Sequence, residues 1–437
     1  MTISELMPIL TLTGGLGFGL LSGFPMAFTL AGSSIVTALI FFGPHTLPFI
    51  ATNIFGMMSS MVLIAMPLFV FMACVLEKSG VAEDLYAFMY QALGPVRGGL
   101  SMGTVLICAI IAAMSGVSTT AVVTMGIIAL PIMLKQGYHK SIAIGPILAG
   151  GALGLLIPPS ISLIVYGMVA RVSIGKLFAG GIVPGLILVA VFLAYIGIRS
   201  FLQPAYAPAL PPEERVSFRE LLLLTKGLIL PIGIVMVVLG TIFAGIASPT
   251  EAAAVGVAGA LISAVINKRL SLKMLSEASV RTMGITGMIM WILFGATCFT
   301  SIFFRTGGQD LISDLLLGFN NPVLIFGFIL VTLIVLGFFL DEITQVMITV
   351  PVFLPIIVEL GYDPVWFGVL FMTQVQMDYL TPPFGFTLFY MKGVAPPEVS
   401  MGDIYRSILP FVLMQLAVVI FILLYPDVVM WLPNLLF

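Results

Sequence analysis

The sequence predicts an all-α polytopic membrane protein built from two inverted-topology repeats, and three observations lead to this fold class. The chain of 437 residues is 60% hydrophobic and only 8% charged, whereas soluble domains are about one quarter charged. Apolar runs long enough to cross a bilayer recur along the whole chain. Many landmark residues recur at one fixed spacing. The net charge of -2 excludes a nucleic-acid partner, because no basic surface could neutralise phosphates.

Ten apolar stretches, separated by polar or helix-breaking residues, predict ten crossings of the lipid bilayer. The start MTISELMPIL has no basic residue before its apolar stretch, so we expect this run to remain as a span rather than to be cleaved as a signal peptide. The predicted crossings lie near residues 4–22, 26–43, 49–76, 141–171, 177–198, 227–246, 251–267, 282–304, 364–391 and 404–425.

Two further apolar stretches, 99–134 and 322–358, are each interrupted midway by polar residues. The arms on either side of the interruption have roughly 16 to 19 residues, which is marginal for a full crossing. We therefore expect two re-entrant helical hairpins, whose polar tips are tolerated at membrane depth only where they line a protein cavity. The tips are Ser115-Gly116-Val117-Ser118-Thr119-Thr120 and Asp341-Glu342-Ile343-Thr344-Gln345.

The second half of the chain repeats the first at an offset of 224 residues, the difference between Pro382 and Pro158. The first repeat is expected to cover 1–202 and the second 227–437, with a polar linker at 203–226. Each repeat would hold five crossings and one hairpin, and because five is odd the second copy must be inverted. The pairs that fall into register include Pro25 with Pro249, Cys74 with Cys298, Thr120 with Thr344, and Pro158-Pro159 with Pro382-Pro383.

The distribution of basic residues predicts the orientation, because Lys and Arg are enriched in cytoplasmic loops. With both termini outside, all but three of the 17 Lys and Arg residues lie on the cytoplasmic side. The exceptions are Arg171, Lys176 and Arg305. The linker 203–226 is then cytoplasmic, the first hairpin opens from the cytoplasm, and the second opens from outside.

Two proline pairs interrupt the spans that follow the hairpins, at 154–160 and 379–385. Proline removes an amide donor and clashes with the preceding helical turn, so both spans are expected to unwind there. Unwinding frees carbonyl groups for a cation and helix N-termini for an anion. A pair of packing kinks is the alternative interpretation.

We expect the tips and the breaks to meet near the midplane and to form the transport site. Hydroxyl and carbonyl oxygens suit Na⁺, and carboxylates inside a membrane are usually functional. The residues expected to bind Na⁺ are Ser115, Gly116, Ser118, Thr119, Thr120, Gly154, Pro158, Asp341, Thr344, Thr381 and Pro382. The residues expected to bind substrate are Pro159, Ser160, Arg305, Glu342, Pro383, Gly385 and Thr387.

Four of the charged residues have alternative interpretations, and two of them, Asp341 and Glu342, could instead belong to a solvated turn outside the lipid. Arg305 could bind a substrate carboxylate through its fork of donors or could anchor a helix end at the headgroups. Asp378 could be an ion ligand or a structural partner of a helix end.

The cysteines Cys74, Cys108 and Cys298 show neither the spacing of a metal site nor that of a disulfide framework. No group of His, Asp and Ser residues with catalytic spacing occurs in the sequence. We therefore expect that the protein is not an enzyme and needs no cofactor beyond Na⁺ as coupling ion.

Four motifs in order, MSGVSTTAVVTMG, GALGLLIPPSISLIVYG, FGFFLDEITQVM and MDYLTPPFGFTLFYMKG, resemble the large membrane subunit of TRAP (tripartite ATP-independent periplasmic) transporters in the ion transporter superfamily. The resemblance covers the whole length. It implies Na⁺-coupled uptake of organic acids, such as C4-dicarboxylates, sialic acid or other carboxylates, across a bacterial or archaeal inner membrane. It also implies two protein partners, a periplasmic substrate-binding protein and a small four-helix membrane subunit that would here be a separate polypeptide.

The resemblance further implies an elevator mechanism, with a scaffold formed by the first three spans of each repeat and a moving transport domain formed by the hairpins and broken spans. Amphipathic stretches at 77–97 and 305–321 would be arms in the membrane interface, with plain loops as the alternative. Some family members carry an acidic residue in the second arm of the first hairpin, where this chain has only Ser, Thr, Ala and Val at 118–124. The alternative function is a stand-alone Na⁺- or H⁺-coupled anion symporter or antiporter of the same superfamily.

Overall fold

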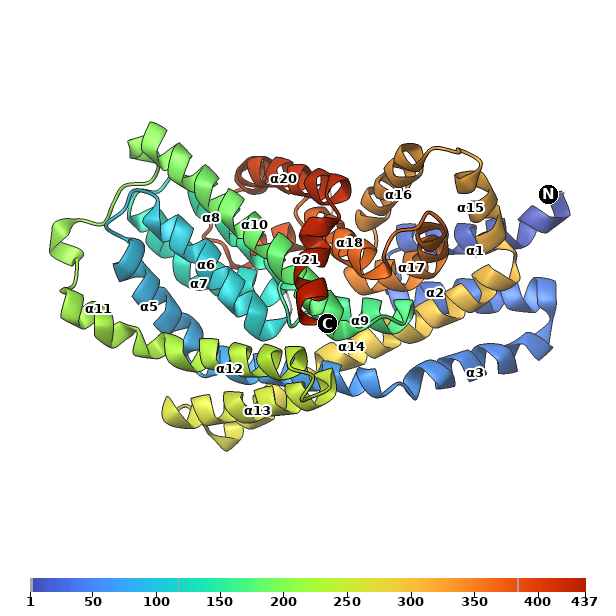
Figure 1. The fold of residues 1–437 in the computed structure, drawn as a ribbon, viewed down its shortest axis with the longest axis horizontal. Helices are drawn as coiled ribbons and strands as arrows, with labels where there is room; N and C mark the ends of the chain where they lie inside the picture. Colours follow the sequence, from blue (N-terminus) through green and yellow to red (C-terminus); the bar gives the residue numbers. More distant parts are fainter. Residues whose placement is uncertain (1–2, 117, 383–384) are drawn as a thin grey trace.

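The computed structural model describes residues 3–116, 118–382 and 385–437, and the side chains of these residues except those of residues 3–5 and 226. Helices and short connections make up this part of the chain, and it contains no β-strand. The predicted all-helical fold is therefore confirmed. Figure 1 shows the helices as one elongated bundle.

The helices of the first half follow the predicted order. Short 3₁₀ turns at Pro44–Thr46, Met61–Ile64 and Leu153–Leu155 and a π turn at Ala38–Phe42 connect some of them. The α-helices are α1 (Ile3–Leu21), α2 (Met26–Thr37), α3 (Leu47–Met58), α4 (Ala65–Lys78), α5 (Val81–Leu93), α6 (Gly99–Ser115), α7 (Ser118–Lys135), α8 (Lys140–Ala152), α9 (Ile161–Ala170) and α10 (Ile174–Leu202).

The second half begins after a linker that contains 3₁₀ turns at Pro204–Tyr206 and Pro212–Glu214. Shifting the bounds of α7 by 224 residues gives the bounds of α17 at both ends, so the spacing seen in the sequence recurs in the helices. The α-helices are α11 (Phe218–Leu224), α12 (Lys226–Phe243), α13 (Pro249–Ile266), α14 (Leu272–Arg305), α15 (Gly308–Leu317), α16 (Pro322–Gly337), α17 (Glu342–Glu359), α18 (Pro364–Asp378), α19 (Phe386–Val394), α20 (Met401–Leu424) and α21 (Asp427–Leu436).

One predicted span, 49–76, is wrong as a continuous helix. The chain leaves the helical conformation at Ser60, whose backbone is extended (φ −70°, ψ 120°), so that α3 and α4 are separate. The hydroxyl of Ser59 donates a hydrogen bond to the carbonyl of Phe55 at 2.9 Å, a contact of serine with the preceding turn that weakens a helix. The corresponding region of the second half is a single helix, α14, of 34 residues.

Seven helical segments in the described part of the chain are long and apolar enough to cross a membrane, namely Met61–Lys78, α7, α10, α13, α14, α17 and α20. Of the remaining predicted crossings, α12 is long enough only together with the preceding helix α11, from which it is bent, and the others consist of shorter apolar helices. Among them, α8 and α9 form one interrupted span and α18 and α19 the other, with the interruptions at the two proline pairs.

The amphipathic stretches are helical, so the alternative of plain loops is wrong. Helix α5 covers the middle of the first stretch and α15 the middle of the second. Both helices begin after a glycine in the left-handed conformation, Gly80 and Gly307, where a side chain would be strained. Helix α5 packs against α6 and α12, and α15 packs against α14 and α17.

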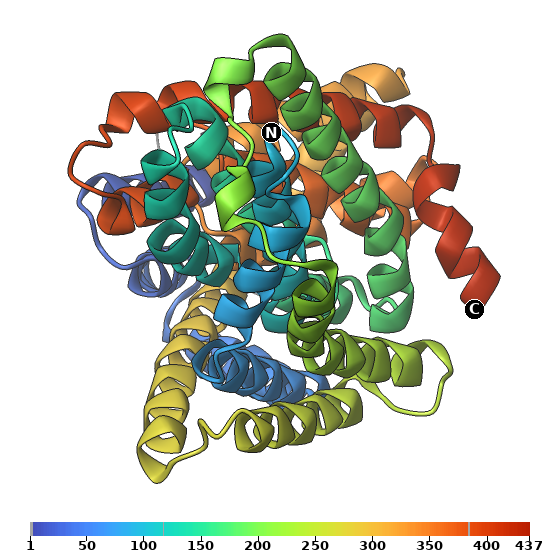
Figure 2. The same ribbon diagram turned by 90° about the vertical axis from the view of Figure 1, so that its left-hand side faces the viewer.

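Small residues allow the long helices to cross closely, as is usual inside membranes. Helix α2 packs against α14 where Gly295 meets the backbone of Ala27, and α4 packs against α13 where Gly256 meets the side chain of Met72. Figures 1 and 2 both show α12, α13 and α14 along one side of the bundle, with the hairpins above them.

Two adjacent glycines hold the first hairpin against the interrupted span. A Cβ atom on Gly150 of α8 would lie 2.8 Å from the Cβ atom of Cys108 in α6. A Cβ atom on Gly151 would overlap Val122 in α7. Both arms therefore pack directly on α8, and this contact positions the tip of the hairpin beside the break that follows α8.

Candidate functional site

The first hairpin tip touches the first proline break. Gly116 ends α6 in the left-handed conformation with φ 61°, and a Cβ atom on it would lie only 2.6 Å from the carbonyl oxygen of Pro159. The backbone of the tip is thus in direct contact with the backbone of the break. The structure brings these two predicted elements together.

The first break runs from the 3₁₀ turn that contains Gly154 through the buried residues Pro158 and Pro159 to Ser160. The hydroxyl of Ser160 donates to the carbonyl of Leu155 at 2.7 Å and accepts from the amide of Leu163 at 3.3 Å. Ser160 therefore spans the break and caps α9. Since its hydroxyl is used inside the break, substrate binding by this group would require a rearrangement.

The hydroxyl residues of the first tip face two different spaces. Ser118 and Thr119 line a large cavity, whereas Ser115 and Thr120 line a small void of about 20 Å³ against α4 and α5. Ser118 is 2% exposed. Its hydroxyl makes no hydrogen bond to any part of the chain that the structure describes, which leaves this oxygen available for an ion or a ligand.

Asp341 caps the second arm of the second hairpin. One carboxylate oxygen accepts hydrogen bonds from the amides of Ile343 and Thr344 at 3.1 and 3.0 Å. The other oxygen accepts from the hydroxyl of Thr344 at 2.6 Å. Asp341 and Thr344 thus form one compact cluster of hard oxygen atoms at the N-terminus of α17, a donor set that fits Na⁺.

Glu342 follows Asp341 and lines the large cavity. Its amide donates to the hydroxyl of Tyr379 at 3.5 Å, which joins the second tip to the start of the second break. No ion pair of Glu342 occurs within the described residues. Its carboxyl group therefore forms an acidic part of the cavity wall.

The second break joins α18 to α19 through two threonine hydroxyls. Thr381 donates to the carbonyl of Met377 at 2.8 Å, and Thr387, fully buried, donates to the carbonyl of Tyr379 at 2.6 Å. Gly385 packs against the same Tyr379 carbonyl. Pro382 is exposed, and Pro383 lies outside the described residues.

Both hairpin tips line one cavity of about 630 Å³, called the central cavity below. Gly116, Ser118 and Thr119 come from the first tip and Asp341 and Glu342 from the second. The opposite wall is formed by the connection between α1 and α2 and by one face of α14, with residues that include Phe24, Phe28, Met288, Trp291 and Ile292.

The structure does not bring Arg305 to the central cavity. Its guanidinium group lies over the rings of Phe42 and Phe49, 5.1 and 5.8 Å from their centroids, at the exposed end of α14. Of the two interpretations of this residue, the geometry favours an anchor at the helix end, because the guanidinium packs on aromatic faces rather than facing the site.

Asp378 also lies outside the central cavity, at the end of α18. It is 1% exposed and accepts hydrogen bonds from the side-chain amides of Gln374 at 2.9 Å and Gln345 at 3.5 Å. It packs directly on Gly337, the last residue of α16. The carboxyl group thus connects α16, α17 and α18, which favours a structural partner of helix ends over a substrate contact.

Sequence reasoning missed the aromatic wall and the α14 wall of the central cavity. Three aromatic residues flank the second break and one precedes the second tip, and their position beside predicted functional elements was a usable signal. The residues of α14 carry no such signal, because an apolar face of a membrane helix looks the same whether it meets lipid or a cavity. The missed aromatic residues beside the break and tip are Tyr379, Phe386, Tyr390 and Phe339.

Comparisons with known proteins agree on one family. The family model described as "Tripartite ATP-independent periplasmic transporter, DctM component" matches residues 14–428. The C4-dicarboxylate TRAP transporter large permease protein DctM of Pseudomonas aeruginosa is 31% identical, and the match covers 92% of this chain and 93% of that protein. The ectoine/5-hydroxyectoine TRAP transporter large permease protein UehC of Ruegeria pomeroyi is 32% identical, and the match covers 96% of this chain and 97% of that protein.

Among solved structures, the YdaH transporter of Alcanivorax borkumensis superposes with a TM-score of 0.64 at 15% identity, covering 91% of this chain and 96% of that chain. At this level of identity the likeness concerns the fold alone.

Proposed function

Because this chain belongs to the DctM family of large permease components of TRAP transporters, we propose that it takes up organic acids by secondary active transport coupled to Na⁺. The relatives named above carry different compounds, so the family alone leaves the substrate open. The observation that carries the proposal is the central cavity, in which both hairpin tips meet. A site built from two discontinuous helical elements at one cavity is the arrangement that secondary transporters use for an ion and a substrate.

The coupling ion is assigned to oxygen-rich groups at the two tips. At the second tip, Asp341 and Thr344 supply a carboxylate and a hydroxyl within 2.6 Å of each other. At the first tip, the hydroxyl of Ser118 and the backbone around Gly116 are available beside the carbonyl of Pro159. Na⁺ enters as a transported ion, and its charge would offset the negative charge of Asp341 and Glu342 in a low-dielectric site.

The two expected partners are part of the proposal. TRAP permeases work with a periplasmic substrate-binding protein and a small membrane subunit, and we propose both as partners of this chain.

The proposed orientation has both termini outside. The linker that contains α11 is then cytoplasmic, and the α1–α2 connection that lines the cavity lies in the half of the molecule toward the cytoplasm.

Reconstituted uptake tests the proposal. The chain, its small subunit and its binding protein are placed in proteoliposomes, and uptake of labelled organic acids is followed with an inward Na⁺ gradient. We expect uptake with Na⁺ and without ATP, since the chain has no GxxxxGK[ST] phosphate loop. Unchanged uptake after Na⁺ is replaced by K⁺ would refute the coupling. Full uptake without the binding protein would favour the stand-alone symporter.

A further inference from the structure

The two hairpins differ in how far other helices enclose them. No residue of α6, the first arm of the first hairpin, is exposed, and α6 packs against α4, α5, α8, α10 and α12 as well as against α7. In α16, the first arm of the second hairpin, seven of the 16 residues are exposed, and the main packing partners are α17 and α18. The first hairpin is therefore surrounded by other helices, whereas one side of the second faces outward.

The linker between the repeats holds the base of the first hairpin. Its residues 206–216 are called the strap here. The carbonyl of Ala207 accepts a hydrogen bond from the amide of Gly98, directly before α6, at 3.1 Å, and the carbonyl of Tyr206 accepts from the amide of His139, directly before α8, at 2.8 Å. The ring of Tyr206 also stacks on that of His139, with 4.3 Å between the centroids. The strap therefore fixes the connections that enter and leave the first hairpin.

Glu214 of the strap adds side-chain contacts to the same base. One of its carboxylate oxygens accepts hydrogen bonds from the hydroxyl of Tyr90 in α5 at 2.8 Å and from the side-chain amide of Gln136, directly after α7, at 3.0 Å. Its backbone carbonyl accepts from the side-chain amide of Gln91 at 3.2 Å. Three of the 11 strap residues are proline, which restricts the backbone of the strap. The strap thus ties α5 to the hairpin and is itself stiff.

The base of the second hairpin has no such strap among the described residues. The hydrogen bonds of the turns 318–321 and 360–363 stay within these turns and the helices that they join. The hydroxyl of Tyr166 in α9 donates to the carbonyl of Pro364 at 2.7 Å, but Pro364 begins α18 and belongs to neither arm. Helix α17 packs against α9 and α14. The least constrained parts of the second hairpin are therefore α16 and the tip.

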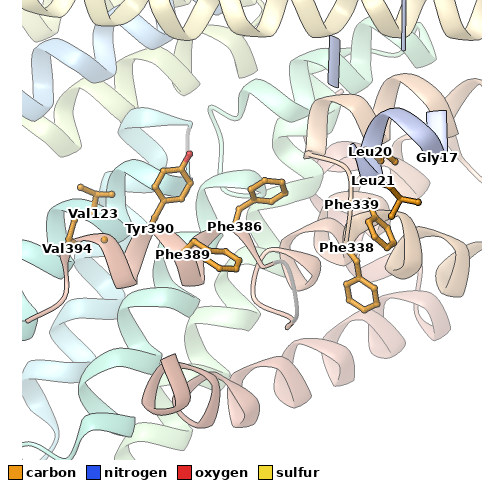
Figure 3. A pocket seen from close by; sticks show the side chains of 11 residues that line it. Gly17, Leu20, Leu21, Val123, Phe338, Phe339, Phe386, Phe389, Tyr390 and Val394 are labelled. Carbon is orange, nitrogen blue, oxygen red and sulfur yellow. The ribbon is translucent and has the colours of Figure 1, made fainter. Parts of the chain in front are cut away.

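The spaces beside the two tips differ even more in size. The void of about 20 Å³ beside the first tip has room for about one water molecule. An apolar groove of about 1120 Å³, called the outer groove here, lies between α1, α7, α19 and the residues Phe338 and Phe339 that precede the second tip. Figure 3 shows these two rings and those of Phe386, Phe389 and Tyr390 on α19 along the groove. Since close-packed atoms cannot move into one another, only the second tip has room for a large displacement.

We propose that the second hairpin is the gate of the central cavity and that the first hairpin is its fixed wall. The inference rests on the proposed function and names the moving part of that same site. To admit substrate, the second tip and α16 swing toward the outer groove. The contact of the Glu342 amide with the hydroxyl of Tyr379, at 3.5 Å, then breaks. The contact of Gly116 with the carbonyl of Pro159 stays closed.

Amide hydrogen exchange tests which tip opens. The full chain with its small subunit is placed in lipid nanodiscs in KCl, without Na⁺ or substrate, and exchange is followed by mass spectrometry. Both tips line the central cavity, and local opening exposes the amides of the tip that moves. We expect the second tip, 341–345, to exchange at least ten-fold faster than the first tip, 115–120. Equal rates, or faster exchange at the first tip, would overturn the inference.

Filling the outer groove should keep the gate closed. Gly17 of α1 lines the groove, and no described atom lies within 4 Å of a Cβ placed there. The indole of Gly17→Trp therefore fits the closed structure but occupies the room that the tip needs. We expect exchange at the second tip to slow at least five-fold and Na⁺-driven uptake to fall at least five-fold, with exchange at the first tip unchanged.

Gly14→Trp is the matched control for the filled groove. Gly14 lies one turn earlier in the same helix, also has no described atom within 4 Å of a Cβ placed there, and does not line the groove. This variant should change exchange at either tip, and uptake, by less than two-fold. Equal effects of the two tryptophan variants would contradict movement of the tip into the groove.

Failure of this inference and failure of the proposed function give different results. Na⁺-driven uptake together with equal exchange at the two tips would leave the proposed function intact and overturn the gate. Faster exchange at the second tip that Gly17→Trp slows and Gly14→Trp does not, in a protein without Na⁺-driven uptake, would support the gate and refute the proposed function.

Discussion

Gly116 is the residue on which the contact between the first tip and the first break depends. It combines a positive φ of 61° with close approach to the carbonyl of Pro159. Gly116→Ala would add left-handed strain of about 1–2 kcal/mol and would push the tip away from the break. We expect a lower melting temperature and a loss of most Na⁺-driven uptake, both measured on the purified variant.

Gly361→Ala is the matched control for this substitution. Gly361 also has a positive φ, of 83°, but no atom lies within 4 Å of a Cβ placed there. It should therefore show the strain without the displacement, with a similar loss of stability and near-normal uptake. If both variants transported equally well, contact between the tip and the break would not be needed for function.

The pair Asp341 and Thr344 provides a test of the ion site at the second tip. Thr344→Ala removes a buried hydroxyl that lies 2.6 Å from the Asp341 carboxylate, so one oxygen of the cluster is lost. We expect the Na⁺ concentration for half-maximal uptake to rise at least three-fold. Thr349→Ala is the control, because Thr349 is also buried in α17 but donates only to the carbonyl of Gln345 within the helix. An unchanged Na⁺ dependence in Thr344→Ala would exclude this cluster as an ion site.

At the scale of elements, the sequence predicted the hairpins and broken spans because their signals are chemically unusual. A proline pair or a carboxylate inside an apolar run has few structural explanations, and Pro158-Pro159 and Asp341 lie at a break and a tip in the structure. The separation of α3 from α4 at Ser60 was not predicted, since serine is compatible with a membrane helix. The α14 wall around Trp291 was missed because apolar residues that face lipid and those that face a cavity are alike in sequence.

The first proline break is predicted to keep its span unwound for function rather than for packing. In Pro158→Ala/Pro159→Ala, each replacement favours a continuous helix by roughly 3 kcal/mol. Closing the helix would pull residue 159 away from Gly116 and return the free carbonyl groups of the break to helical hydrogen bonds. We expect uptake and Na⁺ affinity to fall while the melting temperature holds or rises.

Pro146→Ala serves as the control for the break, because Pro146 lies inside helix α8, away from the break. It should leave uptake near the wild-type value. The packing-kink interpretation expects the opposite for the double variant, with stability lost and transport by the surviving protein retained. Melting temperature and uptake measured on the same preparations separate the two interpretations.

At the scale of the whole molecule, the two halves pack on each other through matching pairs of helices. Helix α2 packs on α14 and α4 on α13, α7 packs on α19 and α17 on α9, and α8 packs on α20 and α18 on α10. Each pair becomes the other when the helices are shifted by one repeat. Two halves related by a two-fold axis produce this exchange, and we therefore propose that the repeats are inverted around one central site.

We propose that transport uses an elevator mechanism in which α10 moves with the hairpins and broken spans, because it packs on α6 and α18, while α12 stays with the scaffold. Gly175 of α10 faces Ile242 of α12, with 3.4 Å between a Cβ on the glycine and the isoleucine side chain. Gly259 of α13 faces Ile234 of the same α12 at 3.0 Å, and both of these helices belong to the proposed scaffold. The chain thus offers two similar glycine and isoleucine pairs, one across the proposed boundary and one within the scaffold.

Cysteine pairs at these positions test whether the boundary moves. Gly175→Cys/Ile242→Cys, once oxidised, should abolish Na⁺-driven uptake, and a reducing agent should restore it, because a disulfide tolerates only a narrow range of Cα separations and would tie the moving part to the scaffold. Gly259→Cys/Ile234→Cys should form its disulfide and still transport, since neither helix moves relative to the other. The native cysteines are buried, and each single-cysteine variant controls for their involvement. Uptake at the wild-type rate by fully cross-linked Gly175→Cys/Ile242→Cys would exclude displacement of α10 along α12, and transport would then have to proceed by local opening of the hairpin tips around the central cavity.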